Sequence, residues 1–165
     1  MFDGGIEKEL NGCKRILIPS PKVATYDMAP EMSAKEITTR LLEEIEKFDV
    51  IILNFANCDM VGHTGDFKAA IKAVETVDEQ LGKIYNKINE LDGMLIVTAD
   101  HGNCEEMLDD DNNKLTAHTT NLVPFIVCNQ NYKLIDGKLG DIAPTILKIM
   151  NLEIPSEMTG KVLID

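Results

Sequence analysis

Residues 49–56 have the sequence Asp-Val-Ile-Ile-Leu-Asn-Phe-Ala, and this short stretch decides the fold class. Its apolar side chains follow one another instead of alternating with polar ones, which predicts a strand that is buried on both faces. Three further runs share this character, at residues 15–19, 94–98 and 123–128. Strands covered on both faces are typical of sheets that lie between two layers of helices. We therefore expect an α/β chain.

Helical patterns lie between and after these four runs. Residues 33–48 begin with a Ser-x-x-Glu capping box and then repeat apolar side chains on one helical face. Residues 66–91 carry the longest such pattern, and Asp66 is placed to cap the first exposed N–H groups. A third helix is expected to start at Asp141 and to end before Pro155.

The order of these elements predicts how the sheet is connected. Strands that alternate with helices favour right-handed crossovers and parallel pairing, although the last two strands can pair either way. The predicted architecture is therefore a three-layer α/β/α fold with a mainly parallel sheet. The acidic stretch at residues 109–113 lies between elements and is expected to be a solvated turn.

Composition and charge are those of one acidic globular domain over residues 1–165. The chain has 16 Lys and Arg against 28 Asp and Glu, a formal net charge of −12, with 44% hydrophobic residues. This charge argues against nucleic acid as a partner, because binding to its phosphates needs clustered Lys and Arg. The apolar run at residues 50–53 is far shorter than the roughly 20 residues of a membrane span, and the N-terminal residues carry no secretion signal. We expect a cytoplasmic protein with no membrane partner.

The four cysteines favour a reducing compartment. Cys13, Cys58, Cys104 and Cys128 form neither a Cys-x-x-Cys pair nor a dense disulfide framework. Cys58 and Cys104 fall inside polar motifs, yet we interpret them as small buried neighbours of a site and not as thiolate ligands.

All three histidines lie in loops beside predicted strand ends. They belong to the segments 59–65, 100–103 and 116–120. Ligands bind beyond the carboxyl ends of the strands in an open parallel sheet, so Asp59 and His63 are expected to approach Asp100 and His101. Carboxylate oxygen and imidazole nitrogen without thiolate suit Mn²⁺ or Zn²⁺. The sequence therefore predicts a divalent-metal site.

Two nearby divalent ions are a common solution to phosphoryl chemistry. Together with His118, the chain offers five candidate ligands, enough for one complete and one partial site. It offers no serine or threonine in an activated-nucleophile motif and no convincing basic clamp for a phosphate. A simpler alternative is that Asp100 caps a short helix at residues 103–107 while His101 forms a local hydrogen bond.

Five blocks of sequence, in order along the chain, together resemble one family. They are residues 20–27 (Ser-Pro-Lys-Val-Ala-Thr-Tyr-Asp), 59–63 (Asp-Met-Val-Gly-His), 98–103 (Thr-Ala-Asp-His-Gly-Asn), 116–121 (Thr-Ala-His-Thr-Thr-Asn) and 157–161 (Glu-Met-Thr-Gly-Lys). Over almost its whole length the chain resembles the C-terminal part of cofactor-independent (2,3-bisphosphoglycerate-independent) phosphoglycerate mutase. This family belongs to the alkaline phosphatase superfamily, so the resemblance implies a partial alkaline-phosphatase-like domain.

The resemblance implies an activity and a division of the metal ligands. The family interconverts 3-phosphoglycerate and 2-phosphoglycerate in glycolysis through a phosphoserine intermediate, using two Mn²⁺ ions. Carried over by motif, Asp59, His63 and His118 hold one ion, and Asp100 and His101 supply half of the other site. The resemblance places the serine nucleophile and the substrate-binding residues in N-terminal and middle segments, which act as partners of this one. The isolated chain is then expected to be inactive.

The chain departs from the family pattern at two positions, and two rival hypotheses stay open. Cys58 stands where the family has Pro, and Cys104 stands where it has Ala. One rival is another enzyme of the superfamily, a phosphopentomutase or a metal-dependent phosphatase. The other is a non-catalytic metal-binding or docking module that completes another polypeptide. The blocks at residues 59–63 and 157–161 favour the mutase.

Overall fold

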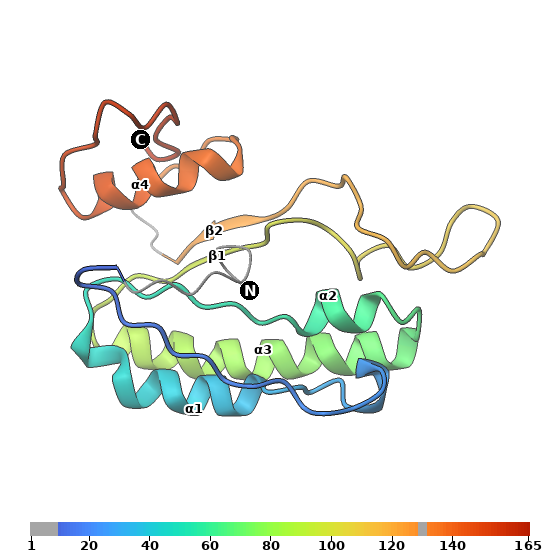
Figure 1. The fold of residues 1–165 in the computed structure, drawn as a ribbon. Coiled ribbons are helices and arrows are strands. Elements are labelled where there is room, and N and C mark those ends of the chain that lie inside the picture. The colour runs from blue at the N-terminus through green and yellow to red at the C-terminus, as the bar shows by residue number, and fades with distance from the viewer. Residues whose placement is uncertain (1–9, 129–131) are drawn as a thin grey trace. The chain divides into compact units, whose positions relative to one another are not determined.

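A computed structural model describes residues 10–128 and 132–165, which form two compact units (Figure 1). Among the described residues, unit 1 comprises residues 10–93 and 101–122, and unit 2 comprises the rest. The prediction about a secretion signal concerns residues 1–9, which lie outside the described part of the chain.

Unit 1 is helical. Its elements are the short η2 (Tyr26–Met28), α1 (Ala34–Glu44), which continues into η3 (Ile45–Lys47), then α2 (Asn57–Gly62) and the long α3 (Phe67–Glu90). Helix α3 packs against both α1 and α2 (Figure 1). The core between them is built from small and medium side chains, namely Val61, Ala69, Ala70, Ala73 and Met107. Because alanines line α3 at this contact, α2 can approach it closely.

The two long helical predictions are confirmed. The pattern at residues 33–48 corresponds to α1 and η3, and the pattern at residues 66–91 corresponds to α3. Asp66 caps α3 as predicted, since its carboxylate accepts a hydrogen bond from the backbone N–H of Ala69 at 2.8 Å. The predicted capping box is wrong, because the Ser33 hydroxyl donates to the carbonyl of Pro19 at 2.7 Å instead. None of the helices in the described residues is long and apolar enough to cross a membrane.

Helix α2 was not predicted, and its beginning is fixed by distant contacts. The Asn57 side-chain amide donates to the carbonyls of Pro30 and Glu31, at 2.9 and 2.8 Å. These bonds join the start of α2 to the loop that precedes α1. The short helix considered at residues 103–107 is a turn in the structure.

The predicted strands at residues 15–19 and 49–56 are wrong for this structure. Both segments lie outside the strands that the described residues form, and several of their apolar side chains are exposed. Leu17 is 69% exposed and Ile52 is 72% exposed. A continuous apolar run becomes a buried strand only when neighbouring strands pair with it and helices cover it. The predicted parallel, three-layer sheet is accordingly not confirmed.

Unit 2 contains the sheet of the described residues. Strands β1 (Ile96–Thr98) and β2 (Phe125–Val127) pair antiparallel, with Val97 opposite Ile126. They confirm the strands predicted at residues 94–98 and 123–128. The sequence left parallel and antiparallel pairing open for these two strands, and the structure shows the antiparallel one. The short η4 (Leu139–Asp141) leads into α4 (Ile142–Ile149), which confirms a third helix from about residue 141 that ends before Pro155.

A buried carboxylate organises the C-terminal part of unit 2. The Asp141 side chain is fully buried and accepts hydrogen bonds from Lys138 Nζ at 2.6 Å and from the backbone N–H groups of Lys138 and Lys161, each at 3.0 Å. The Lys138 ammonium, together with these N–H groups, lowers the pKa of Asp141 to about 2. The carboxylate therefore ties the start of α4 to the C-terminal segment as an anion.

The acidic stretch at residues 109–113 forms the predicted turn in unit 1. The Asp109 carboxylate accepts hydrogen bonds from the backbone N–H groups of Asp111 and Asn113, at 3.0 and 2.7 Å. Leu108 and Lys114 form an antiparallel bridge that closes the turn. The Asp109 carboxylate thus stabilises the turn through these hydrogen bonds.

Candidate metal centre

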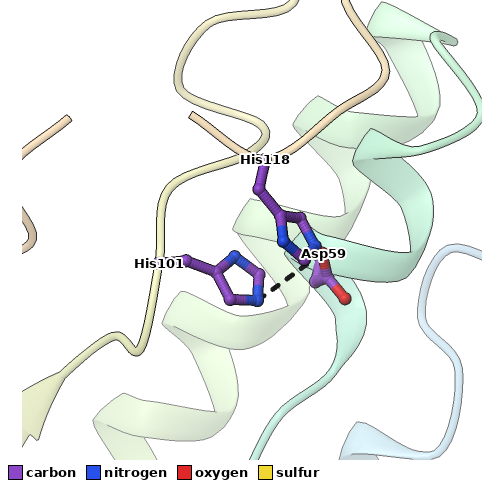
Figure 2. A group of neighbouring side chains, drawn as sticks. All are labelled: Asp59, His101 and His118. Carbon is purple, nitrogen blue, oxygen red and sulfur yellow. Dashed lines mark ion pairs between the residues drawn. The ribbon is translucent and has the colours of Figure 1, made fainter. Parts of the chain in front are cut away.

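Four potential ligand side chains meet in unit 1. Asp59 lies in α2 and His63 caps its C-terminal end, one helical turn later, so both point from the same side of the helix. His101 and His118 come from two loops that lie beside α2, and their rings reach toward Asp59 (Figure 2). All three histidines of the chain therefore gather around one carboxylate.

Three of the four ligand atoms form a nearly equilateral triangle. Asp59 Oδ1 lies 3.1 Å from His63 Nε2 and 3.1 Å from His118 Nε2. The two Nε2 atoms lie 3.1 Å from each other. Two ligands held about 2.0–2.2 Å from one ion, with an angle between tetrahedral and octahedral values, are separated by roughly 2.9–3.5 Å. The triangle therefore has the dimensions of one face of a metal coordination shell.

The hydrogen bond on the far side of the His63 ring favours metal binding. His63 Nδ1 lies 2.5 Å from the carbonyl oxygen of Thr116, which can only accept, so Nδ1 carries the proton. In the neutral ring, Nε2 then presents its lone pair to the triangle. A backbone carbonyl that fixes the tautomer in this way is the usual partner of a ligating histidine.

His101 extends the group. Its ring stacks on His118 with centroids 3.7 Å apart, and its Nε2 lies 4.0 Å from Asp59 Oδ1. Asp59, His101 and His118 each offer one ligand atom, and these atoms lie within 4.8 Å of one another. Asp100 precedes His101 in the chain but belongs to unit 2. The structure thus brings Asp59, His63, His101 and His118 together, while the assignment of each to a particular ion stays a prediction.

Asn103 holds the carboxylate of the group in place, a role that sequence reasoning missed. Its buried side-chain amide donates to Asp59 Oδ1 at 2.8 Å and to the backbone carbonyl of Asp59 at 3.1 Å. The histidines contact the same oxygen, Oδ1, and the Asn103 amide also holds the backbone of Asp59. Gly62 leaves the room for this contact, because a Cβ at position 62 would lie 2.8 Å from Asn103 Cγ.

A second polar network joins the two loops that carry His101 and His118. Gly102 and Thr119 form an antiparallel bridge, with the Thr119 N–H donating to the Gly102 carbonyl at 2.9 Å. The Glu105 carboxylate accepts from the Asn103 N–H at 2.6 Å and from the Thr119 hydroxyl. The hydrogen bond from Thr119 has the largest effect, and together these bonds lower the pKa of Glu105 and favour its ionised form. Residues 101–103 and 118–119 are therefore held as one element.

Two cysteines lie beside the group. The thiols of Cys58 and Cys104 are half-buried. The neighbouring Cys58 thiol lowers the pKa of Cys104 to about 7, and the Cys104 thiol raises the pKa of Cys58. Cys104 also packs against the core of unit 1.

The donor set of this group, one carboxylate and three imidazoles, is that of a site for a divalent transition metal. A family model described as the metalloenzyme superfamily matches residues 1–154. The chain belongs to the metalloenzyme superfamily. Three of the motifs that carried the resemblance supply the group just described, through Asp59, His63, His101 and His118, so the metalloenzyme assignment and the geometry agree.

Two curated proteins are highly similar to this chain. The chain is 61% identical over 168 residues to a 2,3-bisphosphoglycerate-independent phosphoglycerate mutase of Clostridium botulinum (strain ATCC 19397 / Type A), covering 99% of this chain and 33% of that protein. It is 61% identical over 170 residues to the protein of the same name in Clostridioides difficile (strain 630), with the same coverage. These findings confirm the resemblance to that mutase. The chain spans about a third of the length of the curated relatives that it matches.

A solved structure shares the fold. A crystal structure of Leishmania mexicana phosphoglycerate mutase at low cobalt concentration matches with a TM-score of 0.80 and 32% identity. The match covers 90% of this chain and 31% of that one. The chain therefore has the fold of the corresponding part of a phosphoglycerate mutase.

Proposed function

We propose that this chain is the metal-binding part of a phosphoglycerate mutase that interconverts 3-phosphoglycerate and 2-phosphoglycerate through a phosphoserine intermediate. The observation that carries the proposal is the triangle of Asp59 Oδ1, His63 Nε2 and His118 Nε2, with every edge 3.1 Å long. The 61% identity to curated mutases supports the choice of this reaction over the rival enzymes of the same superfamily. A glycolytic role implies a cytoplasmic location.

The proposal assigns the ligands to two Mn²⁺ ions. Asp59, His63 and His118 hold the first ion, and Asp100 and His101 provide part of the second site. The donor set supports Mn²⁺, because mixed imidazole and carboxylate ligands without thiolate suit ions of intermediate hardness. The Leishmania mexicana phosphoglycerate mutase structure is described as being at low cobalt concentration, which supports a site for divalent transition metals.

The chain's own residues position the donors. The Thr116 carbonyl keeps the proton on His63 Nδ1, so that Nε2 remains a lone-pair donor. The Asn103 amide orients the Asp59 carboxylate. Bound divalent ions supply charge neutralisation to the oxygens of a transferring phosphoryl group. The serine nucleophile and the residues that bind phosphoglycerate belong to other segments of the whole enzyme in this proposal.

The other segments of the enzyme are the proposed partners of unit 1. The extended runs at residues 15–19 and 49–56 carry exposed apolar side chains, among them Leu17 and Ile52. Consecutive exposed apolar side chains of this kind are typical of an interface. We propose that strands from the remaining segments pair with these runs and complete a mainly parallel, three-layer sheet.

Calorimetric titration of Mn²⁺ into the metal-stripped chain tests the first ion site. We expect about one ion per chain with the wild-type sequence. Loss of a ligand is expected to weaken affinity at least as much as loss of a supporting residue, which costs roughly 10–100-fold. His63→Ala should therefore reduce affinity by at least that factor. Asp110→Asn, in the exposed acidic turn, is a control outside the ligand group and should bind Mn²⁺ as the wild-type chain does. Equal affinity in His63→Ala and the wild-type chain would contradict the assignment.

A chimera tests the reaction itself. The corresponding third of the Clostridium botulinum mutase is replaced by this chain, and conversion of 3-phosphoglycerate to 2-phosphoglycerate is followed with Mn²⁺ present. We expect an active chimera whose activity is lost in the His118→Ala variant, while the isolated chain is inactive. A folded, Mn²⁺-binding chimera without mutase activity would overturn the proposed function and leave only a metal-binding module.

A further inference from the structure

One carboxylate, that of Glu105, connects the two loops that carry histidine ligands in unit 1. Its Oε2 accepts a hydrogen bond from the backbone N–H of Asn103 at 2.6 Å. Its Oε1 accepts from the Thr119 hydroxyl and, at 3.2 Å, from the side-chain amide of Asn121. Both oxygens of one side chain therefore hold groups that lie in separate loops.

The residues that Glu105 holds are themselves neighbours of the ligands. The Asn103 side-chain amide donates to Asp59 Oδ1 at 2.8 Å, and Thr119 directly follows His118 in the chain. Glu105 is thus connected to two ligands of the triangle through one intermediate residue each. Groups that orient ligands in this way usually matter for metal affinity nearly as much as the ligands do.

The backbone at position 102 is shaped for this carboxylate. A Cβ at Gly102 would lie 2.9 Å from Glu105 Cδ and would overlap the Thr119 hydroxyl oxygen. A carboxylate also has the right chemistry, because it can only accept and the three groups that face it all donate. Glycine at position 102 and glutamate at position 105 therefore act together.

We propose that Glu105 is a positioning residue of the metal centre. It acts on the Asp59 carboxylate through Asn103, and it acts on the His118 ring through Thr119. By holding both intermediates at once, it fixes the relative placement of two ligands and thereby sets how tightly the first ion is held. The inference rests on the proposed function, because it concerns the ion site assigned there, and Glu105 is not itself a ligand.

Mn²⁺ titration by calorimetry tests the effect on affinity. Glu105→Gln keeps the size of the side chain but exchanges one acceptor oxygen for an NH₂ donor, which cannot accept from Asn103 or Thr119. We expect affinity to fall by roughly 10–100-fold. Thr119→Val should cause a similar loss, whereas Thr119→Ser keeps the hydroxyl and should restore wild-type affinity.

Glu106→Gln is the matched control, because it removes the same charge from the next residue. The Glu106 carboxylate accepts from the Asn121 side chain at 2.8 Å, and within the described chain no hydrogen bond joins it to Asn103 or Thr119. We expect wild-type affinity for this variant. If Glu105→Gln binds Mn²⁺ as tightly as Glu106→Gln does, the proposal is overturned.

Nuclear magnetic resonance of the metal-free chain gives a readout that does not depend on ion binding. The rings of His101 and His118 are stacked with centroids 3.7 Å apart, so their protons should show nuclear Overhauser contacts. These contacts should weaken several-fold in Glu105→Gln and Thr119→Val and persist in Glu106→Gln, while amide signals outside residues 101–121 stay as in the wild-type chain.

Two results of this measurement would overturn the role of Glu105. One is that the ring contacts persist unchanged in Glu105→Gln. The other is that Glu105→Gln and Thr119→Val both lose amide dispersion throughout the chain, because general unfolding would then account for any loss of affinity. A wild-type chain that binds no Mn²⁺ would contradict the proposed function instead, and the ring contacts would still decide whether Glu105 positions these loops.

Discussion

Substitution of Gly62 by alanine provides a sharp test of the packing beside the metal-ligand group. Gly62 is the last residue of α2 and is buried, and the chain offers a matched control in Gly82, an exposed glycine within α3. Both lie in unit 1, and alanine would add the same methyl group at each. A Cβ at position 82 meets nothing within 4 Å, whereas a Cβ at position 62 meets the Asn103 side chain and Cys104.

The expected free energies of unfolding therefore change in opposite directions. Alanine in place of glycine in a helix interior gains roughly 0.8–1 kcal/mol, which is the expected effect of Gly82→Ala. Gly62→Ala gains at most this amount, because position 62 ends its helix. Against this, overpacking costs about 1–3 kcal/mol. Displacement of Asn103 also removes its hydrogen bond to the Asp59 carboxylate, worth about 1.5–3 kcal/mol. We expect a net loss of at least about 2 kcal/mol.

The measurement is thermal unfolding followed by far-UV circular dichroism, which reports the helices of unit 1. For a chain of this size, Gly82→Ala should raise Tm by about 2–4 °C and Gly62→Ala should lower it by about 4–8 °C. Mn²⁺ affinity gives a second readout, because loss of a residue that orients a ligand weakens binding by roughly 10–100-fold. Gly62→Ala should show this loss and Gly82→Ala should not. A Gly62→Ala variant as stable as Gly82→Ala would refute the reasoning.

Three further predictions concern other parts of the chain. Asp66→Ala should lower the free energy of unfolding by about 1 kcal/mol in urea denaturation through loss of the α3 cap, while Asp78→Ala, on the exposed face of α3, should not. The pKa of Asp141 is lowered to about 2 from an ordinary 3.8, so its contribution to stability is complete above pH 3.8 and is lost as pH falls through about 2. Acid titration of amide exchange in α4 should show this loss, and Asp141→Asn should abolish the dependence. Ile52 is 72% exposed, so light scattering at high concentration should detect self-association that Ile52→Asp reduces; a monomeric wild-type chain would contradict this.

Local patterns in the sequence predict the helices well because the forces that form them are local. The helix predicted at residues 66–91 differs from α3 by one residue at each end, since its apolar face and its cap both lie within the segment. Strands depend on partners elsewhere. The runs at residues 94–98 and 123–128 find each other and pair, whereas those at residues 15–19 and 49–56 have the composition of buried strands without pairing in the described chain.

The sequence predicts which side chains could be metal ligands, but it does not predict which residues hold those side chains in position. Asp59 and His63 stand four residues apart, a spacing that places both on one helical face and could have indicated α2. Asn103 gives no comparable signal. Its contact with Asp59 joins residues 44 positions apart, and it exists only because Gly62 leaves space between them.

The contacts that hold the ligand triangle in place explain why this chain should bind an ion without catalysing the reaction. The triangle depends on α2, on the Thr116 carbonyl and on the bridge between Gly102 and Thr119, all within unit 1. To these contacts, the exposed runs at residues 15–19 and 49–56, which are the surfaces we assign to partner segments, contribute just the Ala56 carbonyl, which accepts from the Met60 N–H at the start of α2. Mn²⁺ should therefore bind the isolated chain with its first site formed. Conversion of phosphoglycerate should appear only when partner segments bring a nucleophile to the ion, which is why the calorimetric titration and the chimera measure different parts of one proposal.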